Sequence, residues 1–224
     1  MNILNLGSLN IDKTYSVEHY AEAGETIQAK AYGEFCGGKG LNQSIALARA
    51  GAQVFHAGCV GPDGGILLDA LAAAGVRTEL IRESTEPSGH AVIQVNPEGQ
   101  NKITIFGGAN RNVTPAYIDE VLTHFGPGDI LLLQNEISNV PYAIEKGREK
   151  GMTVVFNPSP INGDLERCDL RLVDYLILNE VEGRRLAGTD AEGVVEKLGV
   201  KYPRAILVLT LGSRGSCYAD GKVI

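Results

Sequence analysis

Three glycines and a lysine stand together in Phe35-Cys36-Gly37-Gly38-Lys39-Gly40 and run directly into Leu41-Asn42-Gln43. Glycine lets a backbone approach a small polar ligand closely, because it has no Cβ and tolerates positive φ. The amphipathic stretch 41–50 is typical of a helix, whose first-turn amides would face such a ligand. The segment therefore predicts a ligand-binding loop that leads into a helix, although a glycine-rich surface turn has the same composition.

A phosphate-binding P-loop is the closest alternative pattern. Gly33, Gly38 and Lys39 match the opening of G-x-x-x-x-G-K, but Gly40 stands where a P-loop has Ser or Thr to bind Mg²⁺. Residues 29–35 also alternate small, aromatic and charged side chains like an exposed strand, whereas a P-loop leaves a buried strand. We therefore exclude a P-loop.

A short apolar strand, 3–6, is followed by polar side chains at alternating positions: Ser8, Asn10 and Asp12. Open α/β sheets bind ligands beyond the carboxyl ends of their strands. An amide and a carboxylate there would suit a sugar, which offers both donors and acceptors. A turn rich in Asn and Asp explains the same spacing, so both interpretations stay open.

The composition favours one large domain that binds a small molecule. The chain has 224 residues, of which 44% are hydrophobic, so it can bury a substantial core. A net charge of -7 without a basic cluster argues against nucleic-acid and anionic-membrane surfaces. The 4 cysteines form no CxxC pair, which predicts reduced thiols in a cytoplasmic protein rather than a zinc site or a disulfide framework. We expect no targeting sequence and no membrane segment.

Strand and helix patterns alternate along the chain, which predicts a doubly wound α/β fold, a mainly parallel sheet flanked by helices. The predicted buried strands are 3–6, 54–60, 130–133, 153–156, 175–178 and 205–209.

Two insertions lack this unbroken apolar character. Alternation in Thr26-Ile27-Gln28-Ala29 predicts a strand, and 91–95 with 102–106 predict a hairpin. We expect the insertions, within about 13–35 and 91–106, to form a small β-sheet lid over the site. Such a lid would exclude water when it closes.

Polar residues follow four of the predicted strands. They are Gln134, Asn135 and Glu136; Asn157, Pro158 and Ser159; Asn179, Glu180 and Glu182; and Thr210, Gly212 and Ser213. Loops are polar in general, but parallel strands bring their carboxyl ends to one edge of the sheet. We therefore expect these loops to line a crevice.

Asn179 and Glu182 lie three residues apart at a predicted helix start, so they share one face. A carboxylate there could contact Mg²⁺ through water, since Mg²⁺ keeps several waters and binds mainly substrate phosphates. The same pair is a common capping box, and the sequence favours neither interpretation. Residues 210–215, Thr-Leu-Gly-Ser-Arg-Gly, either offer hydroxyls and amides to a nucleotide or form a tight turn.

Together these segments resemble the ribokinase-type carbohydrate kinases of the PfkB family. The motifs that carry the resemblance occur in the family's order: Gly7-Ser8-Leu9-Asn10-Ile11-Asp12, Gly24-Glu25-Thr26, Gly37-Gly38-Lys39-Gly40-Leu41-Asn42-Gln43, Gly107-Gly108-Ala109-Asn110, Asn157-Pro158-Ser159-Pro160, Asn179-Glu180-Val181-Glu182 and Thr210-Leu211-Gly212-Ser213-Arg214-Gly215. The resemblance covers the whole chain. It implies ATP-dependent phosphorylation of a pentose, D-ribose to ribose 5-phosphate, with another sugar or a nucleoside as the alternative substrate.

The family's residue roles carry over to the matching positions. The resemblance implies sugar contacts at Asn10, Asp12, Gly37, Gly38, Lys39, Gly40, Asn42 and Glu136, and nucleotide contacts at Asn179, Thr210, Leu211, Gly212, Ser213, Arg214 and Gly215. Glu182 matches a position that influences Mg²⁺ and phosphate binding. Mg²⁺ and, in the complete enzyme, a monovalent cation such as K⁺ are the implied cofactors, and a homodimer through the lid is the implied assembly.

The family's catalytic motif, a Gly-Ala-Gly-Asp helix start that supplies the aspartate base and an anion site, is absent from this sequence. Gly126-Pro127-Gly128-Asp129 imitates it but leads into an apolar strand, so its amides cannot form a helix-start anion site. Asp220-Gly221 is a hairpin signal followed by three residues only.

We therefore expect one domain over 1–224 that lacks its C-terminal part and contains no catalytic base. Two functions fit this expectation. The first is a sugar kinase whose closing segment is missing, and the second is a non-catalytic sugar- or nucleotide-binding remnant.

Overall fold

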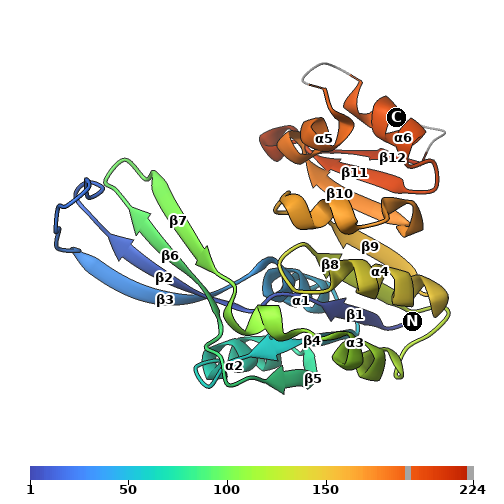
Figure 1. Ribbon diagram of the computed structural model, residues 1–224, viewed down its shortest axis with the longest axis horizontal. Helices are drawn as coiled ribbons and strands as arrows, with labels where there is room; N and C mark the ends of the chain where they lie inside the picture. Colours follow the sequence, from blue (N-terminus) through green and yellow to red (C-terminus); the bar gives the residue numbers. More distant parts are fainter. Residues whose placement is uncertain (190–192, 221–224) are drawn as a thin grey trace.

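The computed structural model describes residues 1–189 and 193–220, and its larger sheet has the order β12-β11-β10-β9-β8-β1-β4-β5 (Figure 1). The strands are β1 (Ile3–Leu6), β4 (Val54–Val60), β5 (Arg77–Glu83), β8 (Ile130–Gln134), β9 (Thr153–Asn157), β10 (Tyr175–Asn179), β11 (Ile206–Thr210) and β12 (Ser216–Ala219). All neighbours pair in parallel except β12, which runs antiparallel to β11. The predicted doubly wound α/β sheet is confirmed.

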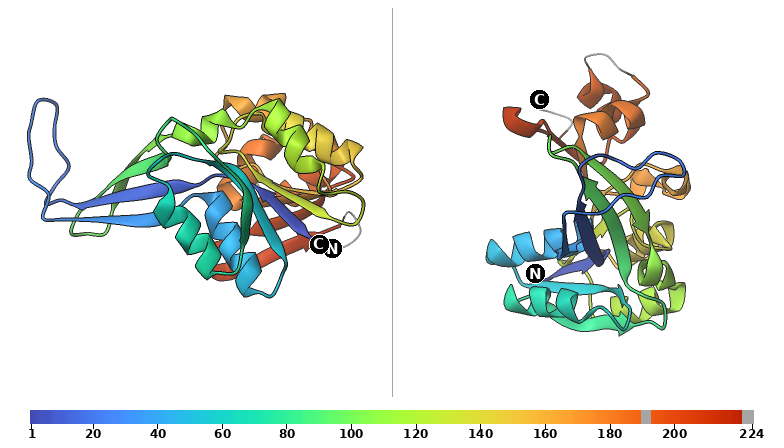
Figure 2. Two further views of the ribbon diagram at one scale, coloured as in Figure 1. Left: turned by 90° about the horizontal axis from the view of Figure 1, so that it is seen from below. Right: turned by 90° about the vertical axis from the view of Figure 1, so that its left-hand side faces the viewer.

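Helices cover both faces of this sheet, which is why its strands are apolar on both sides (Figure 2). Helices α1 (Lys39–Arg49) and α2 (Gly65–Ala73) lie on one face, and α3 (Pro115–Leu122) and α4 (Val140–Glu149) lie on the other. Helices α5 (Glu180–Ala187) and α6 (Val194–Lys201) lie between β10 and β11 in the chain. Helix α3 begins after its N-cap residue Thr114, whose side chain accepts from Tyr117 N at 3.2 Å.

The strand order reverses at β1. From β1 the chain builds outward through β4 and β5, then returns to the other side of β1 with β8 and continues through β9, β10 and β11. The gap between the carboxyl ends of β1 and β8 is therefore the topological switch point, where open α/β sheets bind ligands.

A second, four-stranded sheet of order β3-β2-β6-β7 projects away from the first as an arm (Figures 1 and 2). Its strands are β2 (Asn10–Ser16), β3 (Ala31–Gly37), β6 (Gly89–Val95) and β7 (Asn101–Phe106). Strands β2 and β6 pair in parallel, and β6 and β7 form an antiparallel hairpin. One excursion leaves the main sheet after β1 and the other leaves it after β5.

The predicted strand at Thr26–Ala29 is wrong. This segment lies in the connection between β2 and β3, outside every described strand, and β2 begins earlier than expected, at Asn10. Alternating side chains do not make a strand unless a neighbour pairs with the backbone, and pairing along β2 and β3 reaches only from Asn10–Gly37 to Ser16–Ala31.

The segment that imitates a catalytic motif leads directly into β8, as predicted. Asp129 uses its carboxylate locally, accepting from Asn2 N at 2.8 Å and from Gly126 N at 3.3 Å. Within the described ranges, no helix has the length and apolar character needed to cross a bilayer.

Candidate functional site

The glycine segment forms a close turn between β3 and α1. Gly37 ends β3, and Gly38 is the N-cap residue of α1 with φ of 94°, a conformation that favours glycine. A Cβ on Gly40 would lie 2.3 Å from the backbone nitrogen of Ser8, so the turn after β1 packs directly against the start of α1. Glycine is therefore required here for backbone contact within the protein.

The first-turn amides of α1 are satisfied by the protein rather than left open to a ligand. Lys39 N donates to Glu136 Oε2 at 3.0 Å, Gly40 N donates to Ser8 Oγ at 3.1 Å, and Leu41 N donates to Ser8 O at 3.0 Å. This corrects the expectation that these amides face the ligand. The side chain of Ser8 and the carboxylate of Glu136 are the groups that α1 positions.

Glu136 is the centre of the polar cluster at the switch point. Its Oε2 also accepts from Ser8 Oγ at 2.5 Å, and its Oε1 accepts from Lys39 Nζ at 2.8 Å. The Glu136 side chain is 12% exposed and that of Lys39 is 36% exposed, so the pair lies at the edge of solvent. Charge-assisted bonds from the turn after β1 and from the start of α1 thus meet at one carboxylate, which follows β8.

Asn10 is held in a fixed orientation by a second amide. Its Oδ1 accepts from Asn110 Nδ2 at 2.7 Å, and Asn110 Oδ1 in turn accepts from Leu9 N at 3.0 Å. Asn10 pairs with Gly89 across β6, where a Cβ would lie 2.3 Å from Asn10 Oδ1. Because its oxygen is occupied, Asn10 presents its Nδ2 as a donor.

Asp12 carries a carboxylate that makes no hydrogen bond to another described residue. It lies beside Gly37, where a Cβ would be 2.3 Å from Asp12 Oδ2. Partial burial raises the pKa of Asp12 above its usual value, and the negative charge of Glu136 raises it further. An acceptor in this position is suited to the hydroxyl groups of a ligand.

A cavity of about 190 Å³ lies where the two sheets meet, and it is lined by Asn10, Ile105, Gly107, Asn110, Arg111, Asn135, Glu136, Pro160 and Asn162. Its size is below the roughly 300–1,000 Å³ of drug-sized sites, so it suits a monosaccharide better than a nucleotide. Of the predicted sugar residues, Asn10 and Glu136 line the cavity. Lys39 does not line it but bonds to Glu136, and Asp12 does not line it either. Asn42 lies exposed on α1 and does not line it.

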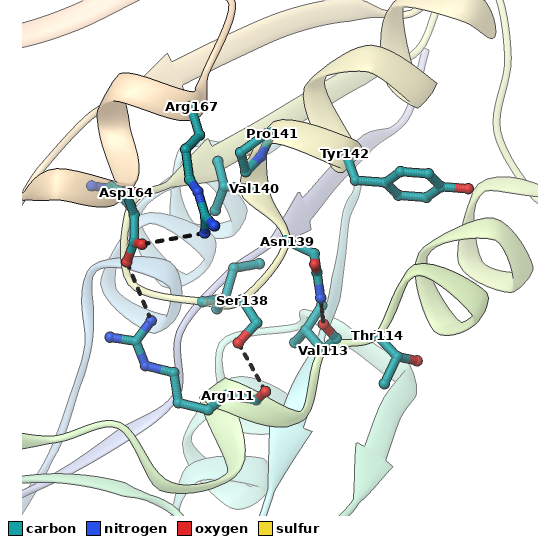
Figure 3. A pocket seen from close by; sticks show the side chains of 12 residues that line it. Arg111, Val113, Thr114, Ser138, Asn139, Val140, Pro141, Tyr142, Asp164 and Arg167 are labelled. Atoms are coloured by element: carbon teal, nitrogen blue, oxygen red, sulfur yellow. Dashed lines mark hydrogen bonds and ion pairs between the residues drawn. The ribbon is translucent and has the colours of Figure 1, made fainter.

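Figure 3 shows the lining of a larger cavity, of about 530 Å³. This cavity shares Arg111 and Asn135 with the smaller one. Asp164 lies between two arginines there, 3.8 Å from Arg111 and 3.9 Å from Arg167. Its negative charge offsets part of their positive charge. We place the candidate sugar site in the smaller cavity because the cluster around Glu136 opens into it. Volume alone would have selected a third cavity, of about 640 Å³, whose lining includes Cys168, Arg185 and Tyr202.

Sequence reasoning gave no individual role to three residues of this region. Asn110 appeared only as part of the Gly-Gly-Ala-Asn motif, and Asn135 only as one of several polar residues after a strand. Asn135 is 4% exposed and donates from Nδ2 to Pro160 O at 2.8 Å and to Asn162 Oδ1 at 3.0 Å. Ser8 is the third. The alternation of polar residues at Ser8, Asn10 and Asp12 is the sequence signal that could have identified Ser8 as a site residue and a partner of Glu136.

The predicted nucleotide residues lie together at the carboxyl ends of β10 and β11. Asn179 is paired with Thr210 across the two strands, and the turn 211–215 is closed by a bond from Leu211 N to Gly215 O at 2.8 Å. Arg214 donates to Glu180 at 2.5 Å. Strands are about 4.8 Å apart, so the ends of β8 and β10, two strands apart, are separated by roughly 10 Å.

Asn179 and Glu182 form the capping box. Asn179 Oδ1 accepts from Glu182 N at 2.9 Å, and Glu182 Oε2 accepts from Asn179 N at 3.0 Å. Glu182 Oε1 has no partner among the described residues, so one oxygen stays available for a metal-bound water. No group of three or more His, Cys, Asp or Glu side chains gathers for direct metal binding in 1–189 and 193–220. The residues therefore fit a Mg²⁺ ion that is coordinated mainly by phosphate oxygens and water rather than by protein side chains.

Comparison with known proteins assigns the family. The pfkB family carbohydrate kinase pattern matches residues 2–223. The chain belongs to this family. It is 34% identical to the ribokinase of Haemophilus influenzae over 220 residues, 94% of this chain and 72% of that protein. It is also 34% identical to the ribokinase of Staphylococcus aureus, with 97% of this chain and 75% of that protein covered.

A solved family structure has the same fold. The structure of Arabidopsis thaliana ribokinase complexed with ribose and ATP superposes with a TM-score of 0.82 at 28% identity, covering 97% of this chain and 74% of that one. The chain thus spans about three quarters of the length of these family members.

Proposed function

We propose that this chain supplies the sugar and nucleotide sites of a kinase that phosphorylates a pentose, D-ribose to ribose 5-phosphate. The observation that carries the proposal is the cluster of Ser8, Lys39 and Glu136 at the switch point, with Asn10 and Asp12 beside it. Support comes from the two bacterial ribokinases and from the plant ribokinase complexed with ribose and ATP. A kinase for another sugar or a nucleoside is the alternative.

The sugar would lie in the cavity between the two sheets. Asp12 accepts from sugar hydroxyls, Asn10 donates to a sugar oxygen through Nδ2, and the Lys39–Glu136 pair offers a donor and an acceptor side by side. Gly37, Gly38 and Gly40 let the turn before α1 pack closely against Asp12 and Ser8, and the exposed Asn42, which does not line the cavity, is given no sugar contact. A polyhydroxy ligand satisfies this mixture of donors and acceptors, whereas an apolar ligand would leave it unpaired.

ATP would lie along the ends of β10 and β11, against Asn179 and residues 210–215. Mg²⁺ bound to its phosphates would neutralise developing negative charge, and Glu182 would hold one of its waters through Oε1. The implied K⁺ has no assigned residue in this chain.

The projecting sheet would act as the lid of the sugar site. Ile105 of β7 already lines the cavity, so a small rotation of the arm would cover a bound sugar. The arm also exposes Tyr32, Phe35, Ile103, Ile105 and Phe106, each 49–60% exposed. Pairing of two such arms in a homodimer would bury this apolar surface.

Phosphoryl transfer joins a sugar hydroxyl oxygen to the γ-phosphorus of ATP and breaks the bond between that phosphorus and the oxygen that leaves with ADP. The hydroxyl proton passes to a base. We assign that base to none of the 224 residues, because the Gly-Ala-Gly-Asp motif is absent from them. Binding of sugar and nucleotide without transfer is therefore expected of these residues by themselves. A non-catalytic sugar- or nucleotide-binding protein is the second candidate.

Calorimetric titration tests the binding proposal. We expect saturable binding of D-ribose, weaker binding of 2-deoxyribose and arabinose, and separate binding of ADP with Mg²⁺. Equal binding of all three sugars would refute the assignment to ribose, and binding of a nucleoside in preference to free sugars would select the alternative substrate.

A further inference from the structure

A buried polar network lies beneath the glycine turn and does not line the sugar cavity. Its members Asn5, Ser44, His56 and Gln134 are all 0% exposed, and they come from β1, α1, β4 and β8. Burying polar side chains at this density is costly unless they are paired. Hydrogen bonds hold the four side chains, and only Gln134 Oε1 among their polar atoms has no partner in the part of the chain that the structure describes.

The partners of His56 define its tautomer. Gly7 O can only accept, so His56 Nε2 carries the proton and donates to it at 3.3 Å. His56 Nδ1 then accepts from Ser44 Oγ at 2.8 Å. Complete burial lowers the pKa of His56 to about 4, which keeps the ring neutral at ordinary pH.

The network continues from Ser44 to the start of α1. Asn5 Nδ2 donates to Ser44 Oγ at 2.8 Å and to Gly40 O at 2.7 Å. Gln134 Nε2 donates to Asn5 Oδ1 at 2.9 Å and to Gln43 Oε1 at 2.6 Å. One chain of hydrogen bonds thus joins the carbonyl of Gly7 to the carbonyl of Gly40.

These two carbonyls belong to the turns that carry Ser8 and Lys39. The turns touch, since a Cβ on Gly7 would lie 2.7 Å from the Cα of Gly40 and 2.4 Å from Gln134 Oε1. On the side facing the cavity, Ser8 and Lys39 both bond to Glu136. The buried network and the Glu136 cluster therefore hold the same two segments together. The network lies on the side away from the cavity, and the Glu136 cluster lies on the side that faces it.

We propose that His56, acting through Ser44 and Asn5, is a positioning residue that sets the distance between the Ser8 turn and the start of α1. The inference rests on the proposed sugar site for its functional consequence, but the positioning itself concerns only the unliganded protein. Loss of the His56 bonds leaves Gly7 O without its donor and the Ser44 hydroxyl proton without an acceptor, although Ser44 Oγ still accepts from Asn5 Nδ2. These unmet hydrogen bonds loosen the two turns against each other.

The experiment measures amide hydrogen exchange at Gly40 and Leu41, whose amides bond to Ser8. We expect His56→Phe, which keeps a planar ring without polar atoms, to speed exchange at both amides about tenfold relative to strands β9 to β11. Ser44→Ala, a smaller change, should do the same. His56→Gln retains a donor that can reach Gly7 O and should restore part of the protection.

The matched control is Ile144→Val on α4, a residue that is 0% exposed on the opposite face of the sheet. It lowers stability without touching the network, so exchange at Gly40 and Leu41 should not change relative to β9 to β11. If His56→Phe and Ser44→Ala behave like this control, the positioning role is wrong.

Ribose titration of the same variants adds a second readout. We expect the Kd for ribose to rise about tenfold with His56→Phe, which corresponds to the loss of one buried hydrogen bond, and to be unchanged with Ile144→Val. Should the unaltered chain bind no ribose, the proposed function fails, and the exchange rates still decide the role of His56.

Discussion

At the scale of single residues, Asp12 offers the sharpest test of the sugar site. Its carboxylate is partly buried beside Gly37 and meets no hydrogen-bond donor among the described residues, so we expect a sugar hydroxyl to be its main partner. Asp12→Ala should weaken ribose binding by about 1.5–3 kcal/mol, or roughly 10- to 150-fold in Kd, and leave ADP binding unchanged. Calorimetric titration of both ligands measures this. Ribose affinity equal to that of the unaltered chain would mean that Asp12 is only a turn residue.

The sequence identified the residue types at the site better than it identified their partners. Asn10, Lys39 and Glu136 come together as their motifs suggested, because each lies at a strand end or helix start whose place follows from the fold. The pairing of Asn10 with Asn110 joins residues 100 positions apart, and no local pattern encodes such a contact. For the same reason the α1 amides looked free in the sequence, although Ser8 and Glu136 occupy them.

At the scale of elements, a substitution at the start of α5 can distinguish a metal-binding role of Glu182 from its helix-capping role. Glu182→Gln keeps the oxygen that accepts from Asn179 N, so the capping box and the melting temperature should be nearly unchanged. If Glu182 Oε1 holds a water of Mg²⁺, the variant should need more Mg²⁺ for the same ADP affinity.

The matched variant is Glu196→Gln, which changes an exposed acid in the first turn of α6, a helix without a capping box. Titrating ADP at several Mg²⁺ concentrations compares the two. An identical Mg²⁺ dependence in both variants would leave Glu182 with its capping role alone.

Elements with unbroken apolar strands were predictable, and those in the arm were less so. Strand β8 is buried on both faces along most of its length, and its unbroken apolar sequence shows it directly. In the arm, alternation suggested a strand at 26–29, whereas the paired segments are β2 and β3 on either side of it. Pairing partners decide which alternating segment becomes a strand, and single-segment periodicity does not contain that information.

At the scale of the whole molecule, strand order explains why the sugar and nucleotide residues form two groups. The sugar residues surround β1 and β8, the nucleotide residues follow β10 and β11, and the end of β9 lies between them. The loop after β9, Asn157-Pro158-Ser159-Pro160, carries amide and hydroxyl groups but no acid. With the proposed sites, a sugar and a nucleotide would lie on either side of a gap, and this loop would offer no base there.

This arrangement predicts that binding and catalysis separate. A missing general base typically costs about 10²–10⁴ in rate, and a missing anion-stabilising donor about 10²–10³ more. From a typical kinase turnover of about 1–100 s⁻¹, the 224 residues by themselves should release ADP below about 0.01 s⁻¹ even when ribose and ATP are both bound. A chimera that adds the segment of Staphylococcus aureus ribokinase lying beyond the matched part should recover ribose-dependent turnover, because that segment would bring the family's base to the gap. A coupled ADP assay on both proteins, each with an Asp12→Ala version as the control for sugar dependence, decides the matter. Turnover above 1 s⁻¹ by the 224 residues alone would show that one of them serves as the base.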